Sequence, residues 1–119
     1  MKYKLDIDKY VHKKATGLVG RPNGEQLLSD LKKDGIIFKD IEIQYDLIEI
    51  IIPKRIRLLN KSFFLGWLET RVQELGKKQF INKYLFVADE YIINRISSEY
   101  IDAALLTSKP EDILKIHDH

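Results

Sequence analysis

Ser62 directly precedes an apolar run and is the residue best placed for chemistry or recognition. The surrounding stretch, residues 59–68, reads LNKSFFLGWL and holds the chain's single tryptophan. A serine at the start of a helix commonly caps it by accepting a hydrogen bond from a backbone N–H of the first turn. Asn60 could do the same. Two interpretations therefore stay open for Ser62: a helix cap alone, or a cap that doubles as a switch or a contact for a partner.

Residues 62–75 have the periodicity of a helix that ends at Gly76. At 100° per residue, the apolar side chains from Phe64 to Leu75 fall within one arc. Phe63 and Trp67 extend that arc, so both are predicted to belong to the core, although an exposed aromatic beside Ser62 would anchor a partner. Arg71 also falls inside the arc, and its stem is expected on apolar surface. The candidate partner-binding residues are Asn60, Lys61, Ser62, Phe63, Trp67 and Arg71.

No pattern of catalytic residues is found elsewhere in the chain. The absence of cysteine excludes thiol catalysis, disulfides and cysteine-ligated zinc. The three histidines, His12, His117 and His119, lie near the two ends and suggest neither a catalytic triad nor a metal site. The segment GLVGRPNG at 17–24 lacks the Gly-Lys-Ser/Thr of a phosphate loop, although Arg21 within it could contact an anionic group. We therefore predict a protein that is not an enzyme and has no cofactor and no metal.

Positive charge is distributed in short groups. The chain has 20 basic and 18 acidic residues and a net charge of +2. Solvated charge at the ends of helices and strands is the simpler explanation. The alternative is a nucleic-acid-binding accessory domain that uses Lys54, Arg55, Arg57, Lys77 and Lys78. A helix of about 14 residues would separate the two groups by about 21 Å, which argues against one compact patch.

The elements expected around Ser62 alternate between strands and helices. Strands are predicted at 3–7, 36–43, 46–53 and 83–89, the third of them covered on both faces because its apolar run is nearly continuous. A helix with an Asn23/Gln26 capping box should end at Gly35, and Asp89 should cap a helix that runs through Ala104. This order predicts an α/β layer fold with a mixed sheet and about three main helices.

Length and hydropathy predict one cytoplasmic domain. A chain of 119 residues is long enough for its own core, expected over about 3–105, with a short tail or helix at 108–119. The N-terminus lacks the apolar segment of a signal peptide, and no apolar stretch approaches the roughly 18 residues of a membrane span.

A family resemblance is carried by several short motifs. Ser62-Phe63 follows an extended apolar run, Leu75-Gly76-Lys77-Lys78-Gln79-Phe80 follows the helix, and Arg21 and Gly24 form an Arg-x-x-Gly turn. Over residues 3–105 the chain resembles the STAS-like domains of unassigned function. These are similar in turn to the STAS domains of anti-sigma-factor antagonists.

The resemblance implies a function in regulation. In the antagonists, a GHKL-type ATPase kinase phosphorylates a hydroxyl at the start of the helix after the central strand, and phosphorylation releases the partner. Only Ser62 matches that hydroxyl; Lys61 and Phe63 differ from the antagonist pattern of Ser or Asp before it and Gly after it. The expected function is a non-enzymatic module that binds a protein partner, such as a GHKL-type ATPase or an anti-sigma-like regulator.

Overall fold

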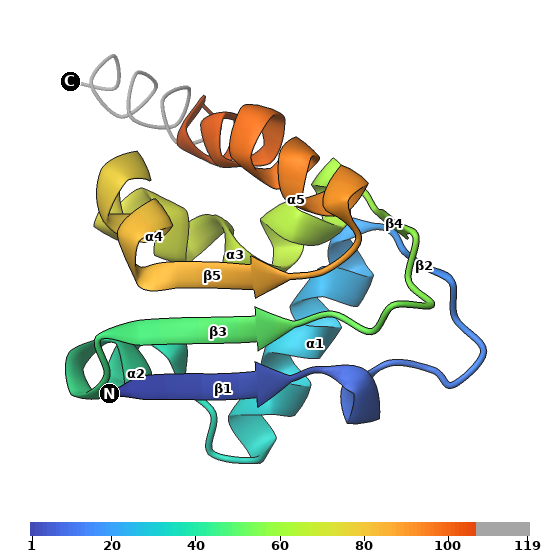
Figure 1. The fold of residues 1–119 in the computed structure, drawn as a ribbon, viewed down its shortest axis with the longest axis horizontal. Coiled ribbons are helices and arrows are strands. Elements are labelled where there is room, and N and C mark those ends of the chain that lie inside the picture. Colours follow the sequence, from blue (N-terminus) through green and yellow to red (C-terminus); the bar gives the residue numbers. More distant parts are fainter. Residues whose placement is uncertain (107–119) are drawn as a thin grey trace, which may run out of the picture.

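Three parallel strands form the central sheet of the protein. The computed structural model describes residues 1–106, so the expected terminal helix and the His117 and His119 side chains lie outside the described residues. The strands β1 (Lys2–Asp6), β3 (Leu47–Ile51) and β5 (Tyr84–Val87) lie in the order β1-β3-β5 (Figure 1). The predicted α/β fold is confirmed, but every strand pair is parallel, so the sheet is not mixed.

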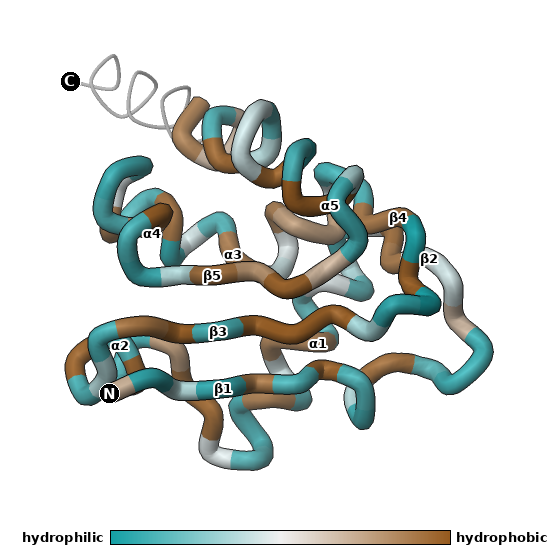
Figure 2. Tube along the Cα trace, in the orientation of Figure 1, coloured by the Kyte–Doolittle hydropathy of each residue, from teal (hydrophilic) through white to brown (hydrophobic). Residues whose placement is uncertain are grey.

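Within residues 1–106, helices cover only one face of this sheet. Along β3, Ile48 and Ile50 are buried, whereas Leu47, Glu49 and Ile51 are partly exposed. Figure 1 shows the helices α1 (Arg21–Lys33) and α3 (Lys61–Leu75) behind the strands, with no described helix in front of them. The prediction that β3 is covered on both faces is therefore wrong. β3 lies between β1 and β5, and Figure 2 shows brown, hydrophobic stretches of its tube on both sides of a hydrophilic position.

The remaining elements are short. They are the 3-10 helix η1 (Asp8–Tyr10), the helices α2 (Phe38–Gln44), α4 (Lys77–Lys83) and α5 (Glu90–Arg95), the π-helix η2 (Ile96–Tyr100), and the strands β2 (Gly17–Leu18) and β4 (Leu58–Leu59). After η2 the chain stays helical to residue 106. As predicted, Gly76 ends α3 and Asp89 caps α5 by accepting a hydrogen bond from the Tyr91 N–H at 2.9 Å.

Two local predictions are wrong for identifiable reasons. The expected strand at 36–43 is instead the helix α2, because Phe38, Ile41 and Glu42 share one buried face at the helical spacing of three and four residues. The expected Asn23 cap is absent because α1 begins three residues earlier than that cap would place it, with Gly20 as its N-cap. The Asn23 side chain donates instead to the Val19 carbonyl at 2.8 Å.

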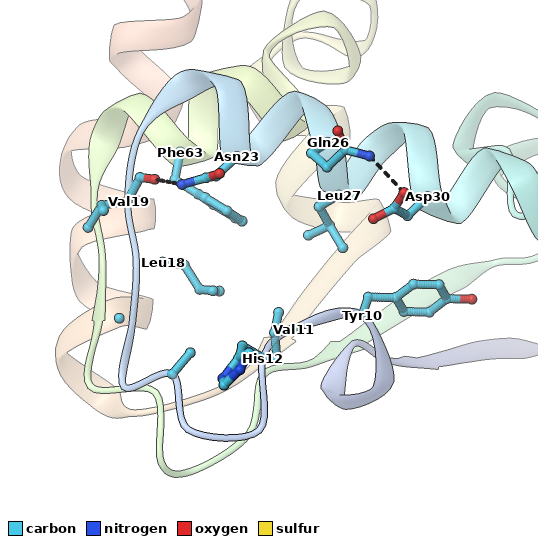
Figure 3. Close-up of a pocket in the computed structure, with 12 residues that line it drawn as sticks. Tyr10, Val11, His12, Leu18, Val19, Asn23, Gln26, Leu27, Asp30 and Phe63 are labelled. Carbon is cyan, nitrogen blue, oxygen red and sulfur yellow. Dashed lines mark hydrogen bonds between the residues drawn. The ribbon is translucent and has the colours of Figure 1, made fainter.

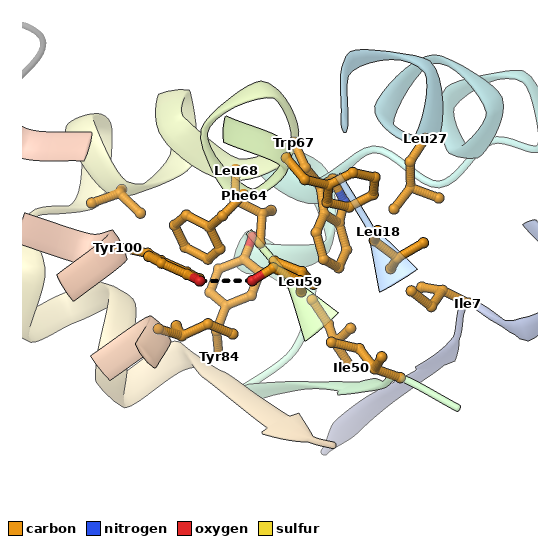
Figure 4. Close-up of a cluster of buried hydrophobic side chains, with 14 of the residues drawn as sticks. Ile7, Leu18, Leu27, Ile50, Leu59, Phe64, Trp67, Leu68, Tyr84 and Tyr100 are labelled. Atoms are coloured by element: carbon orange, nitrogen blue, oxygen red, sulfur yellow. Dashed lines mark hydrogen bonds between the residues drawn. The ribbon is translucent and has the colours of Figure 1, made fainter. Parts of the chain in front are cut away.

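The core lies between the sheet and the helices behind it. Figure 4 shows Phe64, Trp67 and Leu68 of α3 pointing toward side chains of the strands and of α1. The Tyr100 hydroxyl donates to the Leu59 carbonyl at 2.7 Å, a buried hydrogen bond that ties η2 to the strand before α3. This packing holds the first turn of α3 in a fixed position.

Candidate functional site

Asn60, not Ser62, caps α3. The Asn60 side-chain oxygen accepts hydrogen bonds from the Phe63 N–H at 3.0 Å and from the Gly20 N–H at 3.2 Å. Ser62 is therefore the second residue of the helix, and its side chain is exposed. Among residues 1–106, the Ser62 hydroxyl has no hydrogen-bond partner. Both interpretations made Ser62 a helix cap, and that part is wrong because Ser62 lies inside the helix and Asn60 is the cap. A role for Ser62 as a switch or a contact stays a prediction.

Exposed apolar side chains lie beside this turn. Pairing of β2 with β4 places Leu18 next to Leu59, and the Asn60 N–H donates to the Leu18 carbonyl at 3.0 Å. Val19 and Leu58, which flank this pair, are 45% and 44% exposed. We call Val19, Leu58, Asn60, Lys61 and Ser62 the α3 N-terminal surface. The pairing of β2 with β4 involves only two residues of each strand and has no signal in the sequence. For this reason the sequence does not identify Val19 and Leu58 as candidate site residues.

The two aromatic candidates belong to the core, as expected from their place on the helix. Phe63 is 2% exposed and Trp67 is 1% exposed. The Trp67 ring packs edge-on against the rings of Phe63 and Phe86, with centroids 6.1 and 6.4 Å away. Neither side chain can anchor a partner while the core is intact.

Arg71 is held in a nearly buried ion pair. Its Nε lies 2.8 Å from Oε2 of Glu42, and its guanidinium also reaches Glu74 at 3.0 Å. The Tyr84 hydroxyl donates to the same Glu42 carboxylate at 2.6 Å. The hydrogen bond to Glu42 raises the pKa of Arg71, and burial followed by the bond to Glu42 raises the pKa of Tyr84. Arg71 therefore links α2 to α3 through its ion pair and is not part of the α3 N-terminal surface.

Arg21 pairs with a carboxylate of its own chain. Its two terminal nitrogens lie 3.2 and 3.3 Å from the Glu69 oxygens on α3. A Cβ on Gly24, three residues later, would lie 2.1 Å from the Phe63 carbonyl oxygen. The Arg-x-x-Gly motif thus has a structural explanation: the arginine links α1 to α3, and the glycine lets the two backbones approach closely.

The basic groups of the nucleic-acid alternative lie at opposite ends of α3. Lys54, Arg55 and Arg57 precede its first turn, whereas Lys77 and Lys78 follow its last (Figure 1). Three of the five are paired with acidic side chains: Arg55 with Asp8 at 2.6 Å, Arg57 with Asp89 at 3.1 Å, and Lys77 with Asp102 at 2.8 Å. The five residues therefore do not form one cationic patch.

A cavity of about 260 Å³ adjoins the α3 N-terminal surface through Val19. Figure 3 shows Leu18, Leu27 and Phe63 lining its apolar part and Asn23, Gln26 and Asp30 along its edge. Gln26 donates to Asp30 at 2.8 Å. The cavity could receive an apolar side chain from a molecule that covers Val19.

Searches of known families, curated proteins and solved structures find no match to this chain. Within residues 1–106, no helix has the length and apolar character needed to cross a membrane. The same part of the chain has no cluster of three His, Asp or Glu side chains that could hold a metal ion.

Proposed function

We propose that this chain is a non-enzymatic regulatory module that binds a protein partner through the α3 N-terminal surface, under the control of Ser62 phosphorylation. One observation carries the proposal: Ser62 is exposed in the first turn of α3, Asn60 is the cap, and the Ser62 hydroxyl has no hydrogen-bond partner within residues 1–106. The resemblance to STAS-like domains supports the same residue. The partner class that it implies is a GHKL-type ATPase or a similar regulator, acting in the cytoplasm.

The first turn of a helix can accommodate a phosphate on Ser62. The unpaired N–H groups and the helix dipole favour negative charge there by about 0.3–1 kcal/mol at an exposed site. A phosphoserine adds between about 1.5 and 2 negative charges. That charge would stand next to Lys61, on the surface that includes the exposed Leu58. A partner that covers the apolar side chains would have to desolvate the phosphate, so phosphorylation should release it.

The experiment is an affinity capture from lysate of the source cell. The baits are the wild type, Ser62→Ala, Ser62→Asp and, as a matched control, Ser29→Asp, which places the same charge on an exposed serine of α1. Thermal unfolding first establishes that each bait is folded. Mass spectrometry then identifies the captured proteins and measures phosphate on the recovered wild-type chain.

The proposal predicts a partner held by the wild type, Ser62→Ala and Ser29→Asp but lost by Ser62→Asp. Equal capture by all four baits would show that Ser62 does not control binding. Capture of nucleic acid alone, with a steep dependence on salt, would favour the nucleic-acid alternative instead.

A further inference from the structure

A second cavity lies between the middle of α1, the segment 36–39 and the second half of α3. Its volume is about 290 Å³, at the small end of the range for ligand sites. Leu28, Ile36, Phe38 and Trp67 form its apolar wall. We call it the α1–α3 groove. It is separate from the α3 N-terminal surface, because Thr70 and Arg71 of the groove lie about 12 Å along α3 from Ser62.

The charged side chains that line this groove are all cationic. They are Lys32, Lys39 and Arg71. Arg71 is already paired with Glu42, and Lys39 lies 3.7 Å from a Glu74 oxygen. Lys32 is exposed and has no ion pair within residues 1–106. An apolar cavity with this rim is complementary to a ligand that has an apolar body and one negative charge.

The apolar wall includes an unsatisfied polar atom. Trp67 is buried, and its indole N–H finds no acceptor among the described residues. Buried donors without a partner are uncommon in native proteins. The indole N–H of Trp67 is therefore a sensitive reporter of the packing around the groove.

We propose that the α1–α3 groove binds a small monocarboxylate with an apolar tail. The tail packs against Leu28, Ile36 and Ile37, the apolar lining residues that are not buried, and leaves water there. The carboxylate lies beside Lys32 and Lys39. Burial of the tail contributes to affinity, and the cationic rim sets the preference for an anion over a neutral or cationic ligand of the same tail length. This inference does not depend on the proposed function at Ser62.

Trp67 makes the test direct, because it is the only tryptophan in the chain. The probe is sodium octanoate, added as free monomer, with octan-1-ol and octylamine as probes of equal tail length and different charge. Binding is followed by the fluorescence of Trp67 and by the single indole N–H signal in a nitrogen-15 NMR spectrum. The proposal predicts a saturable change in both signals with octanoate, and affinity at least tenfold weaker for the alcohol and the amine.

Charge-reversal variants test the rim. The double variant Lys32→Glu/Lys39→Glu should weaken octanoate binding at least tenfold, and Lys32→Gln/Lys39→Gln should fall between it and the wild type. The control Lys13→Glu/Lys14→Glu makes the same change of net charge at exposed residues that do not line the groove, and should bind octanoate as the wild type does. The proposal is overturned if octanoate gives no saturable change, if octan-1-ol binds equally well, or if the Lys32→Glu/Lys39→Glu protein keeps wild-type affinity.

Discussion

Replacing Gly24 by alanine should destabilise the protein strongly, because α1 and α3 touch through their backbones. A Cβ at residue 24 would lie 2.1 Å from the Phe63 carbonyl oxygen and 2.9 Å from the backbone nitrogen of Trp67. An ordinary contact needs more than about 3.3 Å between carbon and oxygen. The two helices must therefore move apart by about 1 Å, which disturbs the packing of Phe63 and Trp67.

The magnitude follows from two opposing terms. Overpacking of this kind costs about 1–3 kcal/mol, with larger values where only backbone can yield. Alanine recovers up to about 1 kcal/mol of helix propensity relative to glycine. Because the obstacle at Gly24 is backbone, we expect a net loss of about 2 kcal/mol or more. Gly66→Ala, on the opposite helix of the same crossing, should cause a similar loss of stability, because its Cβ would lie 2.2 Å from the Arg21 carbonyl oxygen.

Urea unfolding measures these losses, with Gly17→Ala as the control. A Cβ at Gly17 would lie 3.7 Å from its nearest contacts, two atoms of Leu58, so this variant should stay within about 0.5 kcal/mol of the wild type. The double variant Gly24→Ala/Gly66→Ala should lose less than the sum of the two single losses, because both substitutions separate the same pair of helices. A Gly24→Ala protein as stable as Gly17→Ala would refute the close crossing.

Three further predictions concern the contacts around the site. Asn60→Ala should lower the free energy of unfolding by about 1–2 kcal/mol, because it removes the helix cap. Ser62→Ala should change the free energy of unfolding by less than about 0.5 kcal/mol. If urea unfolding showed the larger loss for Ser62→Ala, Ser62 would be the cap. Arg71→Leu should lower the free energy of unfolding by about 3–5 kcal/mol, because it leaves the Glu42 carboxylate buried without its partner. Adding Glu42→Leu should restore part of that stability. A double variant less stable than Arg71→Leu alone would contradict the explanation by an unpaired buried charge. The raised pKa of Tyr84 means that its stabilising effect is complete below its unfolded pKa of about 10 and is lost at higher pH. Tyr84→Phe should therefore be less stable at pH 7 by about 1.5–3 kcal/mol and should lose less stability above pH 10 than the wild type, as chemical unfolding at each pH would measure.

The sequence predicted those elements whose local signals agree with their tertiary setting. The alternation around Leu5, the apolar run of β3 and the glycine after α3 each specify one structure. Residues 36–43 were misassigned because a run rich in isoleucine favours a strand locally. The ion pair of Glu42 with Arg71 stabilises the helix instead, and such a contact between distant residues leaves no periodic signal.

The candidate site was predicted in part. The position of Ser62 at the start of a helix and the burial of Trp67 both follow from helical periodicity. The choice of Asn60 over Ser62 as the cap could not be predicted, because either side chain can accept the hydrogen bond and the path of the preceding strand decides between them. Val19 joins the surface only through the pairing of β2 with β4, across 40 residues of sequence.

The most direct test of the central claim is the affinity of the purified partner for four forms of the chain. These are the wild type, Ser62→Ala, Ser62→Asp and Ser29→Asp, each compared by calorimetry at physiological salt. The account predicts that Ser62→Asp raises Kd at least tenfold, equivalent to about 1.4 kcal/mol, while the other two variants bind as the wild type does. A Kd for Ser62→Asp equal to that of Ser29→Asp would contradict the account.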